Sequence, residues 1–251
     1  MPGTRVTIKD LAKRMNLSVS TISRALHNHP SIGKKTTGEV WKLAKQLGYF
    51  PNTVASNLRR RKTNMIGVIV PRIDIAFHAH VISGVEEVAY KMGYNVTIYQ
   101  SRDSFEREVA ITGILQTNMV AGIIACLALE TIDCSHFARF NSLKVPLVFY
   151  DRVSNDLEAS KVIIDDFEAA SRVTQHLINI GCMRIAHIAG CQTTSIFSAR
   201  LEGYKAALLK NGLPFDANLV CCANDLSYEE GARCAKKLLK HTELPDGIFC
   251  A

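Results

Sequence analysis

The sequence predicts an N-terminal all-α helix-turn-helix headpiece joined to a larger α/β domain with parallel sheets. Two short amphipathic helical patterns lie about two residues apart near the N-terminus, which is the spacing of a helix-turn-helix. Positive charge is concentrated there, because residues 1–62 hold 13 Lys and Arg against 2 Asp and Glu, whereas the remaining residues hold 17 against 21. From Met65 onward, apolar runs of strand length alternate with helical segments, a pattern typical of parallel sheets covered by helices.

The composition excludes several classes of protein. With 47% hydrophobic and 21% charged residues, the 251-residue chain is expected to fold, and no apolar run is long enough to span a bilayer. The N-terminus lacks the apolar core of a signal peptide, so we expect a cytoplasmic protein with no membrane partner. All eight cysteines follow Thr63 and none forms a C-x-x-C pair. We expect buried, reduced thiols, and we expect neither a metal site nor a cofactor.

Three short helices are predicted in the headpiece. Ile8, Leu11, Ala12 and Met15 share one helical face, and Thr7 with Asp10 has the spacing of a capping box. After Asn16, Ser18 is expected to cap a second helix that points Ile22, Ala25 and Leu26 inward. A third helix buries Val40, Leu43, Ala44 and Leu47, and it stops at Gly48.

The outward face of the second helix has the composition of a surface that reads DNA. It carries short side chains and one long cation: Val19, Ser20, Thr21, Ser23 and Arg24. In the major groove, hydroxyls bind phosphates or base edges, a methyl group meets thymine, and Arg grips guanine with two hydrogen bonds. An ordinary polar face on a three-helix bundle is the alternative. The concentrated basic charge and the short turn favour DNA.

The segment after the headpiece is predicted to be a conditional helix. Pro51 to Leu58 starts with proline and spans about two turns, which is too short for a stable isolated helix. Four adjacent cations follow, Arg59 to Lys62. Their mutual repulsion is reduced when DNA phosphates neutralise their charge. We expect this linker to become ordered when two copies meet over DNA. A simple flexible basic tether is the alternative.

Three stretches of the chain resemble the lac repressor (LacI/GalR) family of bacterial transcription regulators. They are V-T-I-K-D-L-A-K-R-M-N-L-S-V-S-T-I-S-R-A-L, L-G-Y-F-P-N-T-V-A-S-N-L and M-I-G-V-I-V-P. The resemblance implies base contacts from Val19, Ser20 and Arg24. It also implies phosphate contacts from Thr7, Ser18, Thr21 and Ser23, and a hinge in the minor groove formed by Asn52, Ala55 and the wedge residue Leu58. The chain departs from the family at His27, where the family usually has Asn, and at Gly33-Lys34-Lys35, which replaces an acidic first turn.

The resemblance implies that the larger domain is a two-lobed sensor similar to periplasmic sugar-binding proteins, with a ligand in the cleft. The expected divisions are a headpiece over 1–50, a hinge over 51–63, and lobes over 64–152 and 153–251. Helices are expected to end at Gly93, Gly181 and Gly212. The positions that match the family's cleft are Phe77, Asp151 and, in S-A-R-L-E-G-Y, Arg200. Core packing is the alternative for Phe77, and a surface ion pair is the alternative for Arg200. Asp74-Ile75-Ala76-Phe77 replaces the family's Ser-Asn-Pro-Phe.

No enzymatic motif accompanies these features. The chain lacks G-x-x-x-x-G-K-[ST], G-x-G-x-x-G and G-x-S-x-G, and His78-Ala79-His80 has no evident third metal ligand, so no catalytic residue is expected. The last residues, P-D-G-I-F-C-A, form a buried-type strand with nothing after it to cover it, and we expect the sensor to be incomplete there.

The sequence therefore predicts a nucleoid-associated, sequence-specific DNA-binding regulator, most simply a repressor. The resemblance implies that it acts as a homodimer on a pseudo-palindromic operator, under control of a carbohydrate-like effector. The sequence does not distinguish an inducer, which would weaken DNA binding, from a corepressor, which would strengthen it. Three alternatives are a non-inducible DNA-binding fragment, a small-molecule binding module without a DNA role, and an α/β enzyme with a nucleic-acid anchor. The basic headpiece argues against the second, and the missing catalytic set argues against the third.

Overall fold

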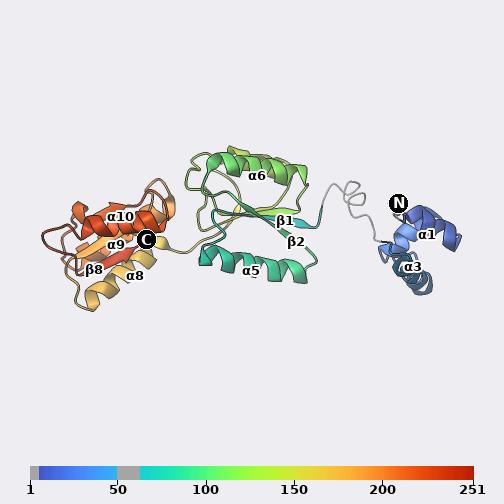
Figure 1. Ribbon diagram of the computed structural model, residues 1–251, viewed down its shortest axis with the longest axis horizontal. Coiled ribbons are helices and arrows are strands. Elements are labelled where there is room, and N and C mark those ends of the chain that lie inside the picture. The colour runs from blue at the N-terminus through green and yellow to red at the C-terminus, as the bar shows by residue number, and fades with distance from the viewer. Residues whose placement is uncertain (1–5, 50–62) are drawn as a thin grey trace. The chain divides into compact units, whose positions relative to one another are not determined.

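A computed structural model describes residues 6–49 and 63–251 of the chain (Figure 1). The chain divides into two compact units, Met1–Arg61 and Lys62–Ala251, each with its own hydrophobic core. The predicted hinge helix from Pro51 to Leu58 lies outside the described residues. Within the two described ranges, no helix combines the length and the apolar character needed to cross a membrane.

The headpiece contains the three predicted helices, α1 (Ile8–Met15), α2 (Val19–Leu26) and α3 (Lys34–Gln46). The backbone N–H and the hydroxyl of Thr7 both donate to the Asp10 carboxylate, at 2.8 and 2.7 Å. α1 ends at Asn16, whose left-handed φ of 54° turns the chain sharply into α2. One core joins the three helices, which confirms the helix-turn-helix fold, and its buried members are Leu11, Ala12, Ile22, Ala25, Leu26, Val40 and Ala44.

The larger unit begins with a sheet of five parallel strands in the order β2-β1-β3-β4-β5. These strands are β1 (Met65–Val70), β2 (Asn95–Gln100), β3 (Gly122–Ala125), β4 (Leu147–Tyr150) and β5 (Ser160–Val162). The first four are connected by α5 (Ala76–Lys91), α6 (Phe105–Thr117) and α7 (Ser135–Ser142). Figure 1 shows α5 and α6 on opposite faces of this sheet. The strand order reverses between β1 and β3, which opens a crevice beyond the carboxyl ends of the strands.

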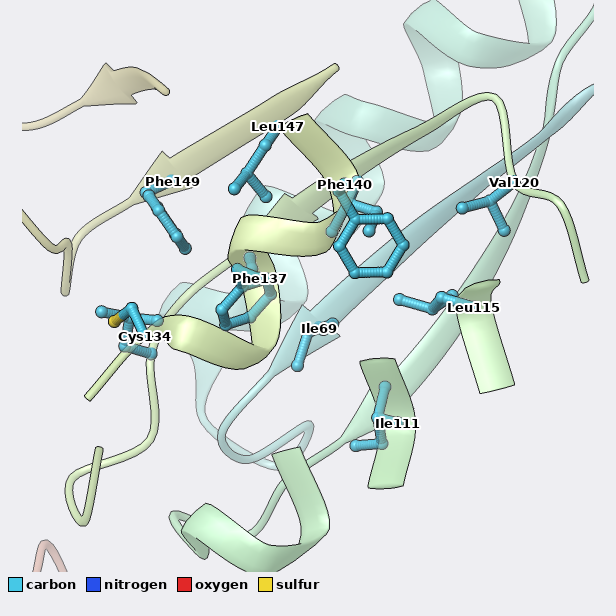
Figure 2. Close-up of a cluster of buried hydrophobic side chains, with 12 residues drawn as sticks. Ile69, Ile111, Leu115, Val120, Cys134, Phe137, Phe140, Leu147 and Phe149 are labelled. Atoms are coloured by element: carbon cyan, nitrogen blue, oxygen red, sulfur yellow. The ribbon is translucent and has the colours of Figure 1, made fainter. Parts of the chain in front are cut away.

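The core of this first lobe lies between the sheet, α6 and α7. Figure 2 shows Phe137 and Phe140 of α7 projecting into it, beside Leu115 of α6 and Ile69 of β1. The rings of Phe137 and Phe149 pack edge to face with centroids 5.3 Å apart. Because successive strand residues alternate between faces, Ile69 faces this core while Val68 and Val70 face the side of α5.

Strand β5 is the element that the sequence analysis missed. The expected first lobe ended at residue 152, whereas Ser160–Val162 pairs in parallel with Val148–Tyr150 and belongs to the first sheet. Its sequence, S-K-V, has no apolar run, because it is a short edge strand with Ser160 and Val162 exposed. The expected lobe boundary at residue 152 stays a prediction, and the pairing of β5 with β4 favours a boundary after Val162.

The second lobe has a three-stranded parallel sheet in the order β7-β6-β8. Its strands are β6 (Ile185–Ala189), β7 (Val220–Cys222) and β8 (Gly247–Cys250), and its helices are α8 (Asp166–Asn179), α9 (Ser195–Lys210), the 3-10 turn η1 (Ala217–Leu219) and α10 (Tyr228–Leu238). Ile185 packs in one core with α8 and α9, and its neighbour Ala186 packs in another with α10. Helices therefore cover both faces of β6, as the alternating sequence predicted. Positive φ angles of 77°, 103° and 71° at Gly93, Gly181 and Gly212 confirm the predicted helix ends.

The expectation of eight buried thiols is wrong for half of them. Cys126, Cys134, Cys221 and Cys234 are buried, but Cys182 and Cys191 are half-buried, and Cys222 and Cys250 are exposed. Apolar runs did not predict burial here, because β7 and β8 are the edge strands of a three-stranded sheet. α10 packs on β6 and β7, so the outward residues of β8, Ile248 and Cys250, stay accessible.

A buried histidine occupies the centre of the second lobe. His187 is fully buried, its Nδ1–H donates to the carbonyl oxygen of Phe249 at 3.0 Å, and its ring stacks on those of Tyr204 and Phe249. Its Nε2 has no hydrogen-bond partner among the described residues. Burial lowers the pKa of His187 to about 4, so the ring is neutral at physiological pH.

Acidification is expected to destabilise the larger unit through His187. An unfolded histidine titrates near pH 6.5, so between about pH 6.5 and 4 the unfolded chain binds a proton that the folded chain does not. Stability is complete above that window and falls as the pH falls, by about 2 kcal/mol at pH 5. His187→Gln keeps a hydrogen-bond donor but does not titrate. Urea unfolding followed by circular dichroism at about pH 7 and 5 should show a smaller loss in the variant; equal losses would contradict the assignment.

Candidate nucleic-acid interface and ligand cavity

The exposed face of α2 presents the side chains that the sequence assigned to DNA. Val19, Ser20 and Arg24 are exposed, and Val19 has 42% of its surface accessible although it is apolar. Thr21 and Ser23 are half-buried at the margins of this face. The exposure of the apolar Val19 side chain to water is unfavourable in the free protein, and contact with a thymine methyl would remove that surface from water.

Hydroxyl groups gather at the N-terminus of α2. The Ser18 hydroxyl accepts from the backbone N–H of Thr21 at 3.1 Å, and it lies 2.8 Å from the hydroxyls of both Ser20 and Thr21. Thr7, at the N-terminus of α1, is also exposed. Free N–H groups and the positive helix end add to these hydroxyls, so the N-terminus of α2 suits a phosphate oxygen.

His27 extends the same face, and the sequence analysis treated it only as a departure from a family pattern. Ser20, Arg24 and His27 follow one another at i, i+4 and i+7, and all three are exposed. The Nδ1–H of His27 donates to the carbonyl oxygen of Ser23 at 2.7 Å, which fixes the ring at the end of α2. Its Nε2 is then the ring atom available to an external group.

The first turn of α3 carries Lys34 and Lys35, both exposed, with no acidic residue in that turn. Cations at a positive helix end are unfavourable in the free protein, and a nearby polyanion relieves them. These two lysines and Arg24 of α2 are exposed cations of the headpiece. The linker residues Asn52, Ala55 and Leu58, expected to complete the interface, lie outside the described residues.

Removing the Ser18 hydroxyl is expected to weaken the headpiece itself. Ser18→Ala leaves the N–H of Thr21 without its cap, which costs about 1 kcal/mol. Trp41, the one tryptophan of the chain, lies in α3, so its fluorescence during urea unfolding reports on this unit. Ser31→Ala, in an exposed turn of the same unit, is the control. It removes only an exposed hydroxyl contact with the His29 ring and caps no helix, so it should change stability by less than about 0.5 kcal/mol. Equal midpoints for Ser18→Ala and the unmodified chain would refute the cap.

A cavity of about 580 Å³ in the larger unit brings Phe77, Asp151 and Arg200 together. Phe77 follows β1, Asp151 follows β4, and Arg200 lies in α9 after β6. All three therefore sit beyond the carboxyl ends of parallel strands, where ligands bind in open α/β sheets. Phe77 has 51% of its surface accessible, which excludes plain core packing. Arg200 lines the cavity and also forms the alternative ion pair, since its Nε donates to Asp166 at 2.8 Å.

Two further charged residues line this cavity, and the sequence analysis missed both. Arg152 is 3% exposed, and its Nη1 donates to Asp103 at 2.6 Å. Asp166 is the first residue of α8 and holds Arg200. Arg152 could have been noticed because it follows Asp151 directly after an apolar run. Asp166 could not, because its partner Arg200 is 34 residues away in sequence.

Asp151 is held in an uncommon backbone conformation at the edge of the cavity. Its φ of 58° is left-handed, which a residue with a side chain adopts rarely and which clusters at functional sites. The Cys126 thiol donates to its carboxylate at 3.5 Å, and the Arg152 Nε lies 4.0 Å from it. Burial raises the pKa of Cys126 to about 12, so this thiol stays protonated as a donor.

The structure places His78 and His80 in different environments. His78 is buried and its Nδ1 lies 3.1 Å from the Tyr150 hydroxyl, whereas His80 is exposed. Burial lowers the pKa of His78, so its ring is neutral near pH 7. Over the described ranges, no group of three or more His, Cys, Asp or Glu side chains is arranged to hold a metal ion.

Family models match both units of the chain. The family model "Bacterial regulatory proteins, lacI family" matches residues 7–52, and "Periplasmic binding proteins and sugar binding domain of LacI family" matches residues 63–251. Catabolite control protein A of Priestia megaterium is 31% identical over 245 residues, which is 97% of this chain and 73% of that protein. The HTH-type transcriptional repressor CytR of Escherichia coli (strain K12) is 30% identical over 247 residues, or 98% and 72% of the two chains.

A solved structure has the same architecture. The transcriptional regulator CelR, in a complex with cellobiose, superposes with a TM-score of 0.67 and 27% sequence identity, over 98% of this chain and 74% of that chain. The similarity therefore extends through both the headpiece and the larger unit, and it includes α2 and the elements that line the cavity.

Proposed function

We propose a function that follows from the family, since the chain belongs to the LacI family of bacterial regulatory proteins. In this proposal α2 reads an operator, and a small carbohydrate-like effector in the cavity controls the binding. The single observation that supports the DNA role best is the exposed α2 face, on which an apolar Val19 stands beside Ser20 and Arg24 in a strongly basic unit. This role requires binding and conformational change and no covalent chemistry.

The proposed DNA contacts divide into two kinds. Val19, Ser20 and Arg24 would meet base edges in the major groove and supply the sequence preference. A second group would meet phosphates and set the position of the headpiece: Thr7, Ser18, Thr21 and Ser23. Asn52, Ala55 and Leu58 of the linker would contact the minor groove, where Leu58 would part a base step at a cost of a few kcal/mol.

The effector would act by shifting populations between arrangements of the two lobes. Phe77 and Asp151 belong to the first lobe and Arg200 to the second, so one ligand that touches all three favours the arrangement that brings them together. The arrangement of the lobes would in turn determine whether the linker that follows the headpiece is ordered on DNA. Both an inducer and a corepressor are consistent with this scheme.

A homodimer is the expected DNA-binding species. One headpiece covers about half a turn of the duplex, and two related by a two-fold axis read a pseudo-palindrome whose half-sites lie about one helical turn apart. CytR is named as a repressor, and repression is the response that we propose for this chain.

In vitro selection from a random duplex library tests the DNA role. The full chain at about 150 mM salt should enrich a pseudo-palindromic site and bind it at least about a thousandfold more tightly than scrambled duplex. Enrichment of no sequence would refute the role. Effector control is tested separately, by adding a panel of sugars to the operator complex. A chain that binds the operator but responds to no member of the panel would instead be a non-inducible DNA-binding protein.

A further inference from the structure

Both cations that line the cavity already have carboxylate partners. Arg200 is bonded to Asp166 at 2.8 Å, with 25% and 10% of their side chains exposed. Arg152 is bonded to Asp103 at 2.6 Å and lies near Asp151 at 4.0 Å. The lining itself therefore holds two guanidinium groups and two carboxylates, and Asp103, outside the lining, is the main partner of Arg152. His78 adds no charge near pH 7, and among the described lining residues no other cation is present.

Helix ends add positive potential at the cavity. α5 and α9 begin beside it, and neither has an acidic residue in its first turn. Each N-terminus is equivalent to about half a positive charge, so the two together offset the negative charge of Asp103, which is not a lining residue. The start of α8 is already neutralised by Asp165 and Asp166. The cavity is thus close to neutral. Its backbone N–H donors lie at two helix starts that no N-cap side chain satisfies, and its carboxylate acceptors are Asp151 and Asp166.

Most of the lining is apolar and accessible. Phe77, Ile163, Ile164 and Leu226 have between 37% and 66% of their surfaces exposed. The ring of Tyr150 lies 6.4 Å from that of Phe77, and the guanidinium of Arg200 lies over the Phe197 ring at 5.6 Å. A free hexose would place hydroxyl groups against these aliphatic and aromatic walls, where they lose hydrogen bonds to water and gain none.

We infer that the effector is an uncharged glycoside that carries an aromatic ring, such as an aryl glycoside or a nucleoside, and is neither a free sugar nor a sugar phosphate. The ring buries against Phe77 and the aliphatic wall. The sugar hydroxyls donate to Asp151 and Asp166 and accept from the helix N–H groups. A phosphate dianion would meet two carboxylates and no unpaired cation. This inference rests on the proposed effector control.

Calorimetry with the full chain, without DNA, tests the inference independently of operator binding. The panel holds phenyl β-D-glucoside, phenyl β-D-galactoside, uridine and adenosine, with glucose, galactose, ribose, glucose 6-phosphate and ribose 5-phosphate as matched ligands. At least one ring-bearing compound should bind about tenfold or more tightly than its parent sugar and its phosphate. The two arms distinguish aryl glycosides from nucleosides. If a phosphate or a free sugar binds as tightly as every ring-bearing compound, or no ring-bearing compound binds below about 10 mM, the inference is overturned.

Two variants separate the apolar and the electrostatic parts. Phe77→Ala should weaken the ring-bearing ligand about fivefold or more and leave the free sugar unchanged. Tyr228→Ala removes an aromatic side chain that is 87% exposed and outside the cavity, and it should change neither. Asp166→Asn leaves Arg200 unpaired, so it should strengthen sugar phosphate binding about fivefold or more. Unchanged phosphate binding in a variant with native circular dichroism would contradict the pairing argument.

Discussion

Replacing Arg24 with alanine is expected to abolish most of the sequence preference of the headpiece. Arg24 is the one long cation on the exposed face of α2, between Ser20 and His27 on the same stripe. A guanidinium that holds a guanine edge with two hydrogen bonds contributes about 1–3 kcal/mol of discrimination, so operator affinity should fall by about 10- to 100-fold. Affinity for scrambled duplex should fall much less, because one phosphate neighbour among many is lost.

Arg14→Ala is the matched control for this prediction. Arg14 is an exposed arginine in the last turn of α1, and it is outside the exposed face of α2. Its removal should weaken operator and scrambled duplex to a similar and small degree, and it should reduce the slope of log affinity against log salt by about one. Titrations of both variants at several salt concentrations supply the comparison. If Arg24→Ala behaves like Arg14→Ala, α2 does not read bases through this residue.

The headpiece could be predicted closely because its structure depends on neighbouring residues. The cap at Ser18, the bond from Thr7 to Asp10 and the alternation of buried and exposed positions all connect residues three or four apart. Patterns of this kind are visible in the sequence itself. His27 was harder, because its role on the surface depends on the bond from its ring to the carbonyl of Ser23, which only coordinates reveal.

The cavity could be predicted only in part, because it is assembled from distant segments. Phe77, Asp151 and Arg200 were found because each lies near a segment with a recognisable pattern, and parallel strands gather such segments at one edge. The roles of Arg152 and Asp166 were not predicted, since their partners Asp103 and Arg200 are 49 and 34 residues away in sequence. Strand β5 escaped for a related reason: its pairing with β4 needs no hydrophobic alternation of its own. Ion pairs and edge strands are properties of the folded chain.

A single methyl group at position 203 is expected to be among the most destabilising changes in the larger unit. Gly203 lies in α9 where that helix packs closely on α8. A Cβ atom there would overlap the carbonyl oxygen of Phe167, and it would lie 3.1 Å from the Cβ of Ala170. Both obstacles are fixed, one being backbone and the other a methyl with no rotamer, so the helices must separate. Overpacking of this kind costs about 3 kcal/mol, which exceeds the gain of about 1 kcal/mol from replacing a helical glycine with alanine.

Two other helical glycines supply the control for Gly203→Ala. Gly84 in α5 and Gly231 in α10 have helical backbone, and a Cβ at either would meet no atom of the described residues within 4 Å. Gly84→Ala and Gly231→Ala should therefore stabilise the larger unit by about 0.5–1 kcal/mol, opposite in sign to Gly203→Ala. Urea unfolding followed by circular dichroism measures this unit, and Trp41 fluorescence should show an unchanged headpiece in all three variants. Since the three substitutions are chemically identical, a difference in sign can come only from the contact between α8 and α9.

That contact joins Asp166, in the first turn of α8, to Arg200 one turn before Gly203, so the same close approach also positions the ion pair that lines the cavity. Stabilisation by Gly203→Ala would mean that the two helices lie farther apart than this contact requires.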